Sequence, residues 1–227
     1  NIEQIIVGGS VPATEHCVMC AGGEDDEEGT IDHLITNVYP TGILSVVSDT
    51  WDYWNTIRNI LSKLRDKILA RNGKYVVRPD SGDPVKIVTG YFPKSIKYTS
   101  AEYTDCAERG SSLHRKIWEN NEEFDCVKTS DGKYFDIYGT ELADYEVKGS
   151  IQVLYEIFGG SPNKAGFIEL DPHIGLIYGD GITYERCEAI LSRLAKKNFA
   201  SSNVVFGIGS YTFQNVTRDT YGLACKA

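Results

Sequence analysis

Short apolar runs that each end in an acidic or glycine-containing turn recur along the chain. The first two are Ile43–Asp49 and Lys74–Gly82, and the last two are Ile174–Gly181 and Asn203–Ser210. Apolar runs of this length, bounded by turn residues, are typical of buried strands. Stretches with the helical spacing of apolar residues follow the first three runs, so the pattern predicts strands that alternate with helices.

The helices predicted between these strands have recognisable start and stop signals. After the first strand, apolar residues recur at helical spacing from Trp51 to about Ala70, and Asn72-Gly73 is expected to end that helix. Pro84 stands at an expected first helical position after the second strand. A third helix is predicted to start near Thr183.

Successive strand–helix units imply parallel strands that are buried on both faces, and therefore an α/β fold. Both a (β/α) barrel and a doubly wound sheet satisfy this pattern, and both place chemistry at the carboxyl ends of their strands. Four polar residues fall at such ends: Asp49, Asp80, Asp180 and Ser210.

Residues 1–227 are predicted to form a single domain. Two regions within it depart from the strand–helix repeat. The acidic run Glu24–Glu28 is expected to start a surface helix, because carboxylates suit a helix N-terminus. Residues 92–173 are interpreted as an insertion between barrel strands. Asp131-Gly132 predicts a β-hairpin inside it, and a helix around Ser150–Phe158 is expected to return to the core.

The overall composition narrows the classes of function. The 227 residues carry 23 Lys+Arg and 32 Asp+Glu, a formal charge of -9, and 41% of them are hydrophobic. This is the composition of a globular protein, and its negative field disfavours nucleic acid and anionic membranes as partners. No apolar run approaches the ~20 residues of a membrane helix.

The cysteines and the first residues of the sequence indicate the cellular compartment and the processing of the chain. Six cysteines are too sparse for a disulfide framework and indicate a reduced, cytoplasmic setting. Cys17-Val18-Met19-Cys20 has the spacing of half a zinc or redox site, but no second pair of cysteines with this spacing and no histidine pair follows it. The chain opens on Asn1 without a secretory signal, which predicts a fragment or a processed chain.

The string Arg78-Pro79-Asp80-Ser81-Gly82 offers a cation, a carboxylate and a turn with free backbone N–H groups. Such a strand end suits a phosphorylated sugar, and Asp49 would add a second carboxylate to hold Mg²⁺ through water. The alternative is an ordinary Asx-type turn with a surface Arg–Asp pair.

Further polar positions extend this candidate site. Gly179-Asp180-Gly181 lets the backbone approach a ligand, and Gly207-Ile208-Gly209-Ser210 resembles a phosphate-cradling turn. Arg218 follows closely enough to reach such a phosphate, or else lies on a helix surface. His16 is a lone histidine, which is more often structural than catalytic. Spacing alone therefore indicates a phosphosugar or nucleotide site.

Taken together, these strings resemble the central barrel portion of the nicotinamide phosphoribosyltransferase family. They occur in family order and span almost the whole chain: Ser10–His16, Val46–Asp49, Val77–Pro84, Tyr178–Ile182, and Val205–Ser210 running into Gln214–Asp219. The resemblance implies a pentosyltransferase of NAD salvage that forms nicotinamide mononucleotide and diphosphate from nicotinamide and 5-phosphoribosyl-1-diphosphate. It also implies Mg²⁺, ATP as co-substrate and a homodimeric parent enzyme.

The resemblance assigns catalytic roles to three residues. His16 would be the histidine that ATP transiently phosphorylates, and Asp49 would orient it and help to organise Mg²⁺. Asp80 would take the ribose hydroxyls and would share the Mg²⁺ with Asp49 through water.

The remaining matched residues would bind substrate. Arg78 would lie beside the nicotinamide ring and the diphosphate, and Gly179 with Asp180 would complete the ribose side. The 5′-phosphate would be held by Gly209, Ser210 and Arg218.

Two departures limit what the family pattern implies. The chain has Gly209-Ser210-Tyr211 where some members have a run of glycines. Family enzymes are also several hundred residues longer, so this chain alone is expected to be inactive. Its long insertion resembles those of bacterial or phage members more than those of animal members. A nicotinate phosphoribosyltransferase and a non-catalytic phosphoribosyl-binding module are the rival interpretations.

Overall fold

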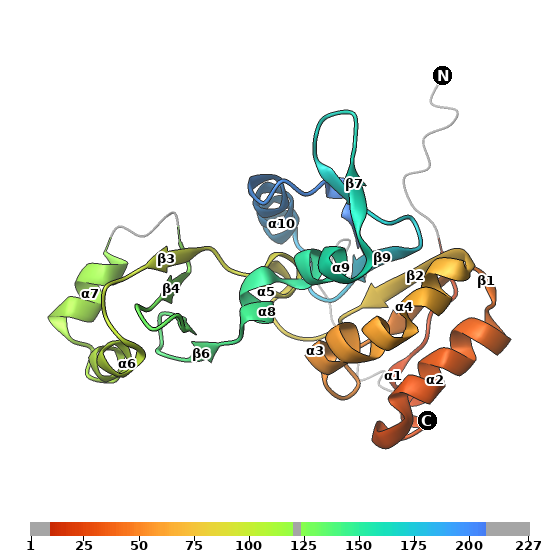
Figure 1. Ribbon diagram of the computed structural model, residues 1–227, viewed down its shortest axis with the longest axis horizontal. Coiled ribbons are helices and arrows are strands. Elements are labelled where there is room, and N and C mark those ends of the chain that lie inside the picture. The colour runs from red at the N-terminus through yellow and green to blue at the C-terminus, as the bar shows by residue number, and fades with distance from the viewer. Residues whose placement is uncertain (1–9, 120–123, 208–227) are drawn as a thin grey trace, which may run out of the picture. The chain divides into compact units, whose positions relative to one another are not determined.

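The computed structural model describes residues 10–119 and 124–207 (Figure 1). The chain divides into two compact units. One is built from the residues up to Pro84 together with those from Leu154 onward, and the other is Val85–Val153.

A four-stranded parallel sheet forms the centre of the first unit (Figure 1). Its strand order is β1-β2-β9-β10, and every neighbouring pair is parallel. The four predicted strands and their parallel pairing are therefore confirmed, as an incomplete barrel-type α/β arrangement. The strands are β1 (Thr41–Val47), β2 (Asn72–Arg78), β9 (Ile174–Tyr178) and β10 (Val204–Phe206).

The connection from β1 to β2 is helical, as predicted, and it ends at Ala70, as expected, but it starts later than Trp51. Trp51 precedes the first helical residue and is 38% exposed, so it does not belong to the buried helix face. Asn72-Gly73 follows directly after the helix and its C-cap, but Gly73 also has a role that the sequence did not indicate. It lies inside β2, where a Cβ atom would come within 2.0 Å of the Gly42 carbonyl oxygen, so the two strands approach closely only because this residue is glycine. The helical segments are α3 (Tyr53–Asn55), the π-helix η3 (Thr56–Ile60) and α4 (Leu61–Ala70).

The residues before β1 form a short extra edge of the sheet. Ala13 makes an isolated parallel bridge with Ser45. The backbone N–H of Thr14 donates to the Ser45 carbonyl at 2.9 Å, and the Thr14 hydroxyl oxygen accepts from the backbone N–H of Val47 at 2.9 Å. This pairing delivers the chain to the carboxyl end of β1, where α1 (His16–Cys20) begins.

The acidic run forms helical structure, but the prediction of a surface helix is wrong for Glu27. That side chain is only 3% exposed, and its Oε2 accepts a hydrogen bond from the Thr56 hydroxyl at 3.0 Å. Burial raises the pKa of the Glu27 carboxyl, and the charges of Asp52 and Glu24 raise it further. The segments here are η1 (Glu24–Asp26), α2 (Glu27–His33) and the π-helix η2 (Leu34–Val38).

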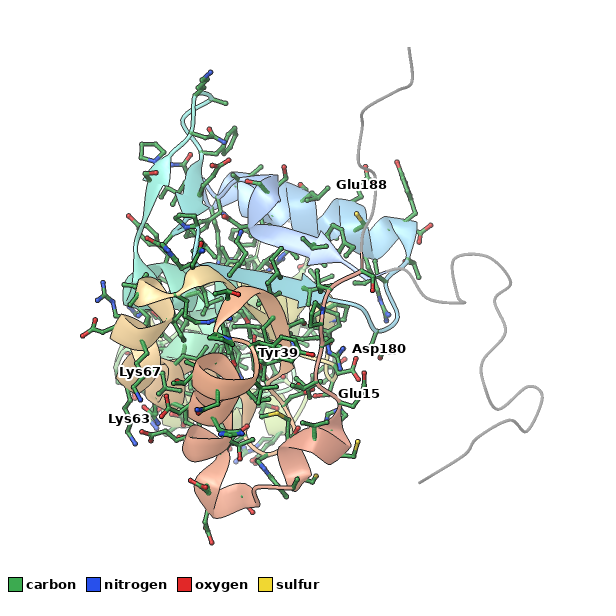
Figure 2. The ribbon with its side chains drawn as sticks, turned by 90° about the vertical axis from the view of Figure 1, so that its right-hand side faces the viewer. Glu15, Tyr39, Lys63, Lys67, Asp180 and Glu188 are labelled. Carbon is green, nitrogen blue, oxygen red and sulfur yellow. The ribbon has the colours of Figure 1, made fainter. Side chains whose placement is uncertain are left out.

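Ion pairs join α2 to α4 on the outer side of the unit. Lys63 Nζ lies 2.6 Å from Glu28 Oε2, and Lys67 Nζ lies 2.7 Å from Asp32 Oδ1. Lys63 and Lys67 are both labelled in Figure 2, where they project from the helices. Because these two ion pairs are partly exposed, they contribute little to stability. They mainly fix how the two helices face each other.

The connection from β9 to β10 is the helix α10 (Tyr184–Lys196). The Thr183 hydroxyl accepts from the backbone N–H of Arg186, so this residue caps the helix at the predicted start. Ile190 and Leu194 are buried. The other elements of this unit are the hairpin β7 (Gly160–Pro162) and β8 (Ile168–Leu170) and the short η4 (Ser201–Asn203).

The second unit holds its own small sheet, ordered β3-β4-β5-β6, with a core that includes Tyr103, Ile117, Val127 and Phe135. Strands β4 and β5 are antiparallel and flank Asp131-Gly132, which confirms the predicted hairpin. Its strands are β3 (Pro93–Ser95), β4 (Cys126–Lys128), β5 (Tyr134–Phe135) and β6 (Glu141–Leu142). The helices are α5 (Pro84–Thr89), α6 (Ser100–Glu108), α7 (Ser112–Trp118), α8 (Asp144–Lys148) and α9 (Ser150–Phe158), which continues into the first unit.

Across the described residues, none of the helices has both the length and the apolar character that crossing a bilayer requires.

Candidate active site

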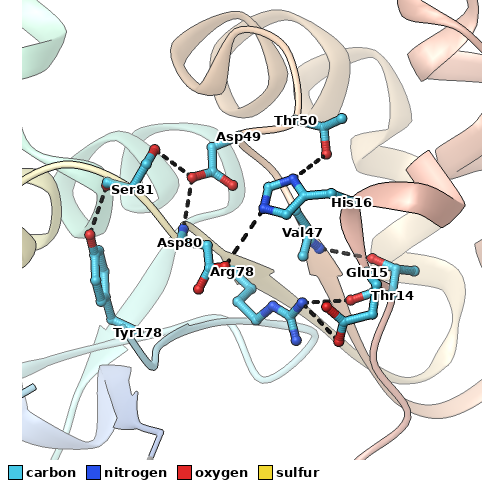
Figure 3. A network of polar contacts seen from close by, with 10 residues as sticks. All are labelled: Thr14, Glu15, His16, Val47, Asp49, Thr50, Arg78, Asp80, Ser81 and Tyr178. Atoms are coloured by element: carbon cyan, nitrogen blue, oxygen red, sulfur yellow. Dashed lines mark hydrogen bonds and ion pairs between the residues drawn. The ribbon is translucent and has the colours of Figure 1, made fainter. Parts of the chain in front are cut away.

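His16, Asp49, Arg78 and Asp80 come together where β1 and β2 end (Figure 3). The His16 ring is held at both nitrogens: Nδ1 lies 3.1 Å from the Thr50 hydroxyl, and Nε2 lies 3.6 Å from Asp80 Oδ2. Both side chains remain accessible, at 47% exposure for His16 and 41% for Asp80. The ring is therefore oriented and still open to a ligand.

Asp80 carries a perturbed carboxyl group. Burial raises its pKa, and the neighbouring carboxylates of Asp49 and Asp180 raise it further. The guanidinium of Arg78 and the His16 ring act in the opposite direction. Burial and the two neighbouring carboxylates thus disfavour the charged form of Asp80, which is the environment that a bound cation relieves.

Asp49 holds the turn that presents Asp80. Its Oδ2 accepts from the backbone N–H of Asp80 at 2.8 Å and from the Ser81 hydroxyl at 2.6 Å. Its Oδ1 is buried and has no hydrogen-bond partner among the described residues. The family pattern would have Asp49 orient His16, but the contacts that orient the ring come from Thr50 and Asp80.

Arg78 faces the segment that leads into α1. Its Nη2 donates to the Thr14 carbonyl at 2.6 Å and lies 3.4 Å from Glu15 Oε1. The side chain is 17% exposed, and its Nε is buried without a partner among the described residues. The guanidinium therefore ties the His16 segment to β2 and retains an N–H for which no described residue is the acceptor.

Tyr178, at the end of β9, supports the same turn from the other side (Figure 3). Its fully buried hydroxyl donates to the Ser81 carbonyl at 2.7 Å and to the Gly82 carbonyl at 3.2 Å. Burial raises its pKa, with further contributions from Asp180 and Asp49, so the hydroxyl keeps its proton. Sequence reasoning missed this role. The available signal was a tyrosine in a buried strand, because a buried tyrosine hydroxyl usually finds a partner.

The Gly179–Gly181 string forms the next part of the edge. A Cβ atom on Gly207 would lie 2.7 Å from the Gly179 Cα, so the chain after β9 and the chain after β10 lie close together because residue 207 is glycine. Gly181 has φ 58° and its carbonyl accepts from Arg186 Nη1 at 2.5 Å. Asp180 is exposed on this edge and is labelled, like Glu15, in Figure 2.

The predicted phosphate-binding residues, Gly209, Ser210 and Arg218, lie outside the described residues.

The donor atoms at this edge suit a hard cation. Within the described ranges, no group of three or more His, Cys, Asp or Glu side chains is arranged to hold a metal ion. The Asp49 carboxylate is nonetheless near enough to raise the pKa of the Asp80 carboxyl, and Asp49 Oδ1 has no partner among the described residues. In proteins, Mg²⁺ is commonly bound by one or two carboxylates, and water and phosphate oxygens supply its other ligands.

Comparison with known proteins identifies the family to which this chain belongs. The model of the nicotinate phosphoribosyltransferase (NAPRTase) family matches residues 1–227. A nicotinamide phosphoribosyltransferase of Acinetobacter baylyi is 43% identical over 98% of this chain and 36% of its own length. One from Mycoplasma pneumoniae is 36% identical over 97% of this chain and 40% of its own length. The chain therefore spans well under half the length of these relatives.

Proposed function

Since the chain belongs to the nicotinate phosphoribosyltransferase family, we propose that it is part of an enzyme of NAD salvage that forms nicotinamide mononucleotide and diphosphate. The substrates in this proposal are nicotinamide and 5-phosphoribosyl-1-diphosphate. The printed names of the relatives support the choice of nicotinamide. The observation that carries the proposal is the linked set of His16, Asp80, Asp49 and Arg78 at one edge of a parallel sheet.

Asp80 is the group proposed to hold the ribose. Transfer of the ribosyl group builds positive charge on the sugar ring, and a fixed carboxylate nearby stabilises that charge. The turn around Asp80 is fastened by Asp49 on one side and by Tyr178 on the other. The carboxylate therefore reaches the sugar with little reorganisation, which is how positioning lowers a barrier. Gly179 and Asp180 complete the ribose side.

Arg78 is proposed to face the departing diphosphate and the nicotinamide ring. The positive charge of its partly exposed guanidinium at this edge supports this role, because a guanidinium binds phosphate oxygens through several N–H groups. The 5′-phosphate is assigned to Gly209, Ser210 and Arg218.

Asp49 and Asp80 are the proposed Mg²⁺ ligands, through water. The unpartnered Asp49 Oδ1 and the raised pKa of Asp80 fit a site that gains from a cation. When bound, Mg²⁺ would neutralise charge that develops on the diphosphate. The protein's own contribution is to hold the two carboxylates at fixed positions.

His16 is the proposed site of transient phosphorylation by ATP, the co-substrate. Its ring is accessible, Thr50 fixes Nδ1, and Asp80 lies near Nε2. Asp80 Oδ2 lies 3.6 Å from Nε2, where its negative charge would stabilise positive charge on the ring. ATP hydrolysis would thereby be coupled to the ribosyl transfer at the same edge of the sheet.

The rival substrate is nicotinate, which the description of the family model names. A second rival is a non-catalytic phosphoribosyl-binding module, which would bind the phosphosugar without turnover. The proposal further takes the working enzyme to be a cytoplasmic homodimer and residues 92–173 to be an insertion in one barrel domain.

The proposal is tested in the full-length protein with Asp80→Ala. Loss of the ribose-positioning carboxylate is expected to remove most formation of nicotinamide mononucleotide, measured as kcat/KM for the phosphoribosyl diphosphate. The matched control is Asp66→Asn, which changes a 94% exposed carboxylate on α4 and should leave turnover unchanged. Turnover near that of the wild type in Asp80→Ala would remove Asp80 from the mechanism.

A further inference from the structure

Helix α1 carries two exposed cysteines as well as His16. Cys17 directly follows His16, and Cys20 is the last residue of the helix. Both are free thiols and both are exposed. We propose that Cys17 and Cys20 form a reversible disulfide by exchange with a small-molecule disulfide such as oxidised glutathione, and that this bond makes the His16 helix sensitive to redox state.

The local backbone brings the two thiols to the same face. Residues three apart on a helix are neighbours, with Cβ atoms about 5–6 Å apart in a regular α-helix. The segment is α-helical, with the Met19 N–H donating to the Glu15 carbonyl at 3.3 Å. Its ends also carry bonds that span three residues, from the Val18 N–H to the Glu15 carbonyl at 3.0 Å and from the Ala21 N–H to the Val18 carbonyl at 3.3 Å. Bonds of this kind tighten the end turns of a helix.

The covalent geometry is within reach of this arrangement. A disulfide takes Cβ atoms roughly 3.5–4.5 Å apart, so the two residues need to close by about 1–2 Å from α-helical spacing. The helix has five residues and ends at Cys20, so this closure alters a single turn. Met19, between the two thiols, is fully buried and anchors the helix while its exposed side changes.

The surroundings favour a redox role over a metal site. Among the described residues, no cluster of three or more His, Cys, Asp or Glu side chains could hold a metal ion. Of the other described cysteines, Cys126 is buried, and Cys106 and Cys187 are half-buried. In a reducing compartment, a disulfide between exposed thiols is typically transient and regulatory.

The chemistry balances with one small-molecule disulfide. The thiolate of one cysteine attacks a sulfur of oxidised glutathione, which forms a mixed disulfide and expels one glutathione thiolate. The thiolate of the other cysteine then attacks the protein sulfur of that mixed disulfide and expels the second glutathione thiolate. Two cysteines are oxidised, one disulfide is reduced to two thiols, and the two cysteine protons end on the released glutathione.

The consequence falls on His16, because its ring is held by residues outside α1. Thr50 and Asp80 contact the two ring nitrogens, so tightening the helix shifts the ring relative to these partners. Disulfide formation itself does not depend on the proposed function. Only an effect of the shifted His16 ring on turnover rests on that function.

The test is a thiol map of the full-length protein after incubation with oxidised glutathione. Free thiols are alkylated and the protein is cut with trypsin. In this sequence the first Lys or Arg is Arg58, and the stretch from Asn1 to Arg58 contains Cys17 and Cys20 and no other cysteine. The expected result is a peptide that has lost two hydrogen atoms and carries no alkyl group, and that takes up two alkyl groups after reduction with dithiothreitol.

Variants make the result specific. Cys17→Ser and Cys20→Ser should each leave one thiol that is alkylated or glutathionylated, whereas the matched control Cys106→Ser should keep the bridge. Two alkylated thiols, or two glutathiones on the wild-type peptide, would overturn the proposal. The link to His16 is tested separately by the NMR signals of the histidine rings. Oxidation should shift the His16 signal and not the His173 signal, and an unmoved His16 signal would refute the link.

Discussion

Replacing Tyr178 by Phe tests whether the turn that presents Asp80 must be held in place. The substitution keeps the buried ring and removes only the hydroxyl, which donates to the Ser81 carbonyl at 2.7 Å and to the Gly82 carbonyl at 3.2 Å. No atom of the substituted residue contacts substrate in the proposed mechanism. Any loss of turnover must therefore pass through the turn.

The expected magnitude follows from the two acceptors. A neutral hydrogen bond contributes about 0.5–1.5 kcal/mol net. The longer of the two contacts adds little, and Ser81 and Gly82 are exposed, so their carbonyls can regain water. We therefore expect a cost of about 1 kcal/mol. If the whole cost appears in the transition state, kcat/KM falls roughly five-fold, because 1.36 kcal/mol corresponds to a factor of about ten.

The assay compares kcat/KM and thermal unfolding for Tyr178→Phe and a matched control, Tyr103→Phe. The Tyr103 hydroxyl also donates to a backbone carbonyl, that of Asp136 at 2.8 Å, and accepts from Trp118 Nε1 at 3.0 Å, but it lies in the core of the second unit. Tyr103→Phe should lower stability by at least as much as Tyr178→Phe and leave kcat/KM unchanged. If both variants have the wild-type kcat/KM, the account of how Asp80 is positioned is refuted.

Three further predictions concern His16, the metal and a buried acid. His16→Ala should abolish the stimulation of turnover by ATP and leave some basal synthesis, and unchanged stimulation would remove His16 from the mechanism. Asp49→Asn should raise the Mg²⁺ concentration needed for half-maximal turnover, because one ligand charge is lost; an unchanged Mg²⁺ titration would contradict its metal role. Burial raises the pKa of Glu27 above its ordinary 4.5, so the folded state holds this proton more tightly than the unfolded state, and stability falls as pH rises between the two pKa values. The wild type should therefore lose stability relative to Glu27→Gln as pH rises across that window, and the difference in melting temperature between the two proteins should then level off. A difference that is the same at pH 4 and pH 8 would contradict this explanation.

The strands were predictable because each apolar run is short and ends in a strong turn signal. The runs around Val46, Val77 and Leu176 are buried strands of one parallel sheet. The end of the first long helix at Ala70 was predictable from Asn72-Gly73, but the role of Gly73 inside β2 was not, because it depends on the close approach of β1. The start of this helix was placed too early, since Trp51 precedes Tyr53, the first helical residue.

Within the candidate site, the residues with distinctive chemistry were predictable and their supports were not. Asp49, Arg78 and Asp80 stand out in the sequence because they follow buried strands. Thr50 and Tyr178 act through contacts between residues that are far apart in the sequence, and no local pattern reports such contacts. Glu27 was misjudged for the same reason, since its burial depends on packing beside Thr56.

The central claim is tested most directly by product formation in the full-length protein supplied with 5-phosphoribosyl-1-diphosphate, Mg²⁺, ATP and either nicotinamide or nicotinate. The account predicts nicotinamide mononucleotide from nicotinamide, with a higher kcat/KM than for nicotinate. Product from nicotinate alone, or binding of the phosphosugar without any product, would contradict it.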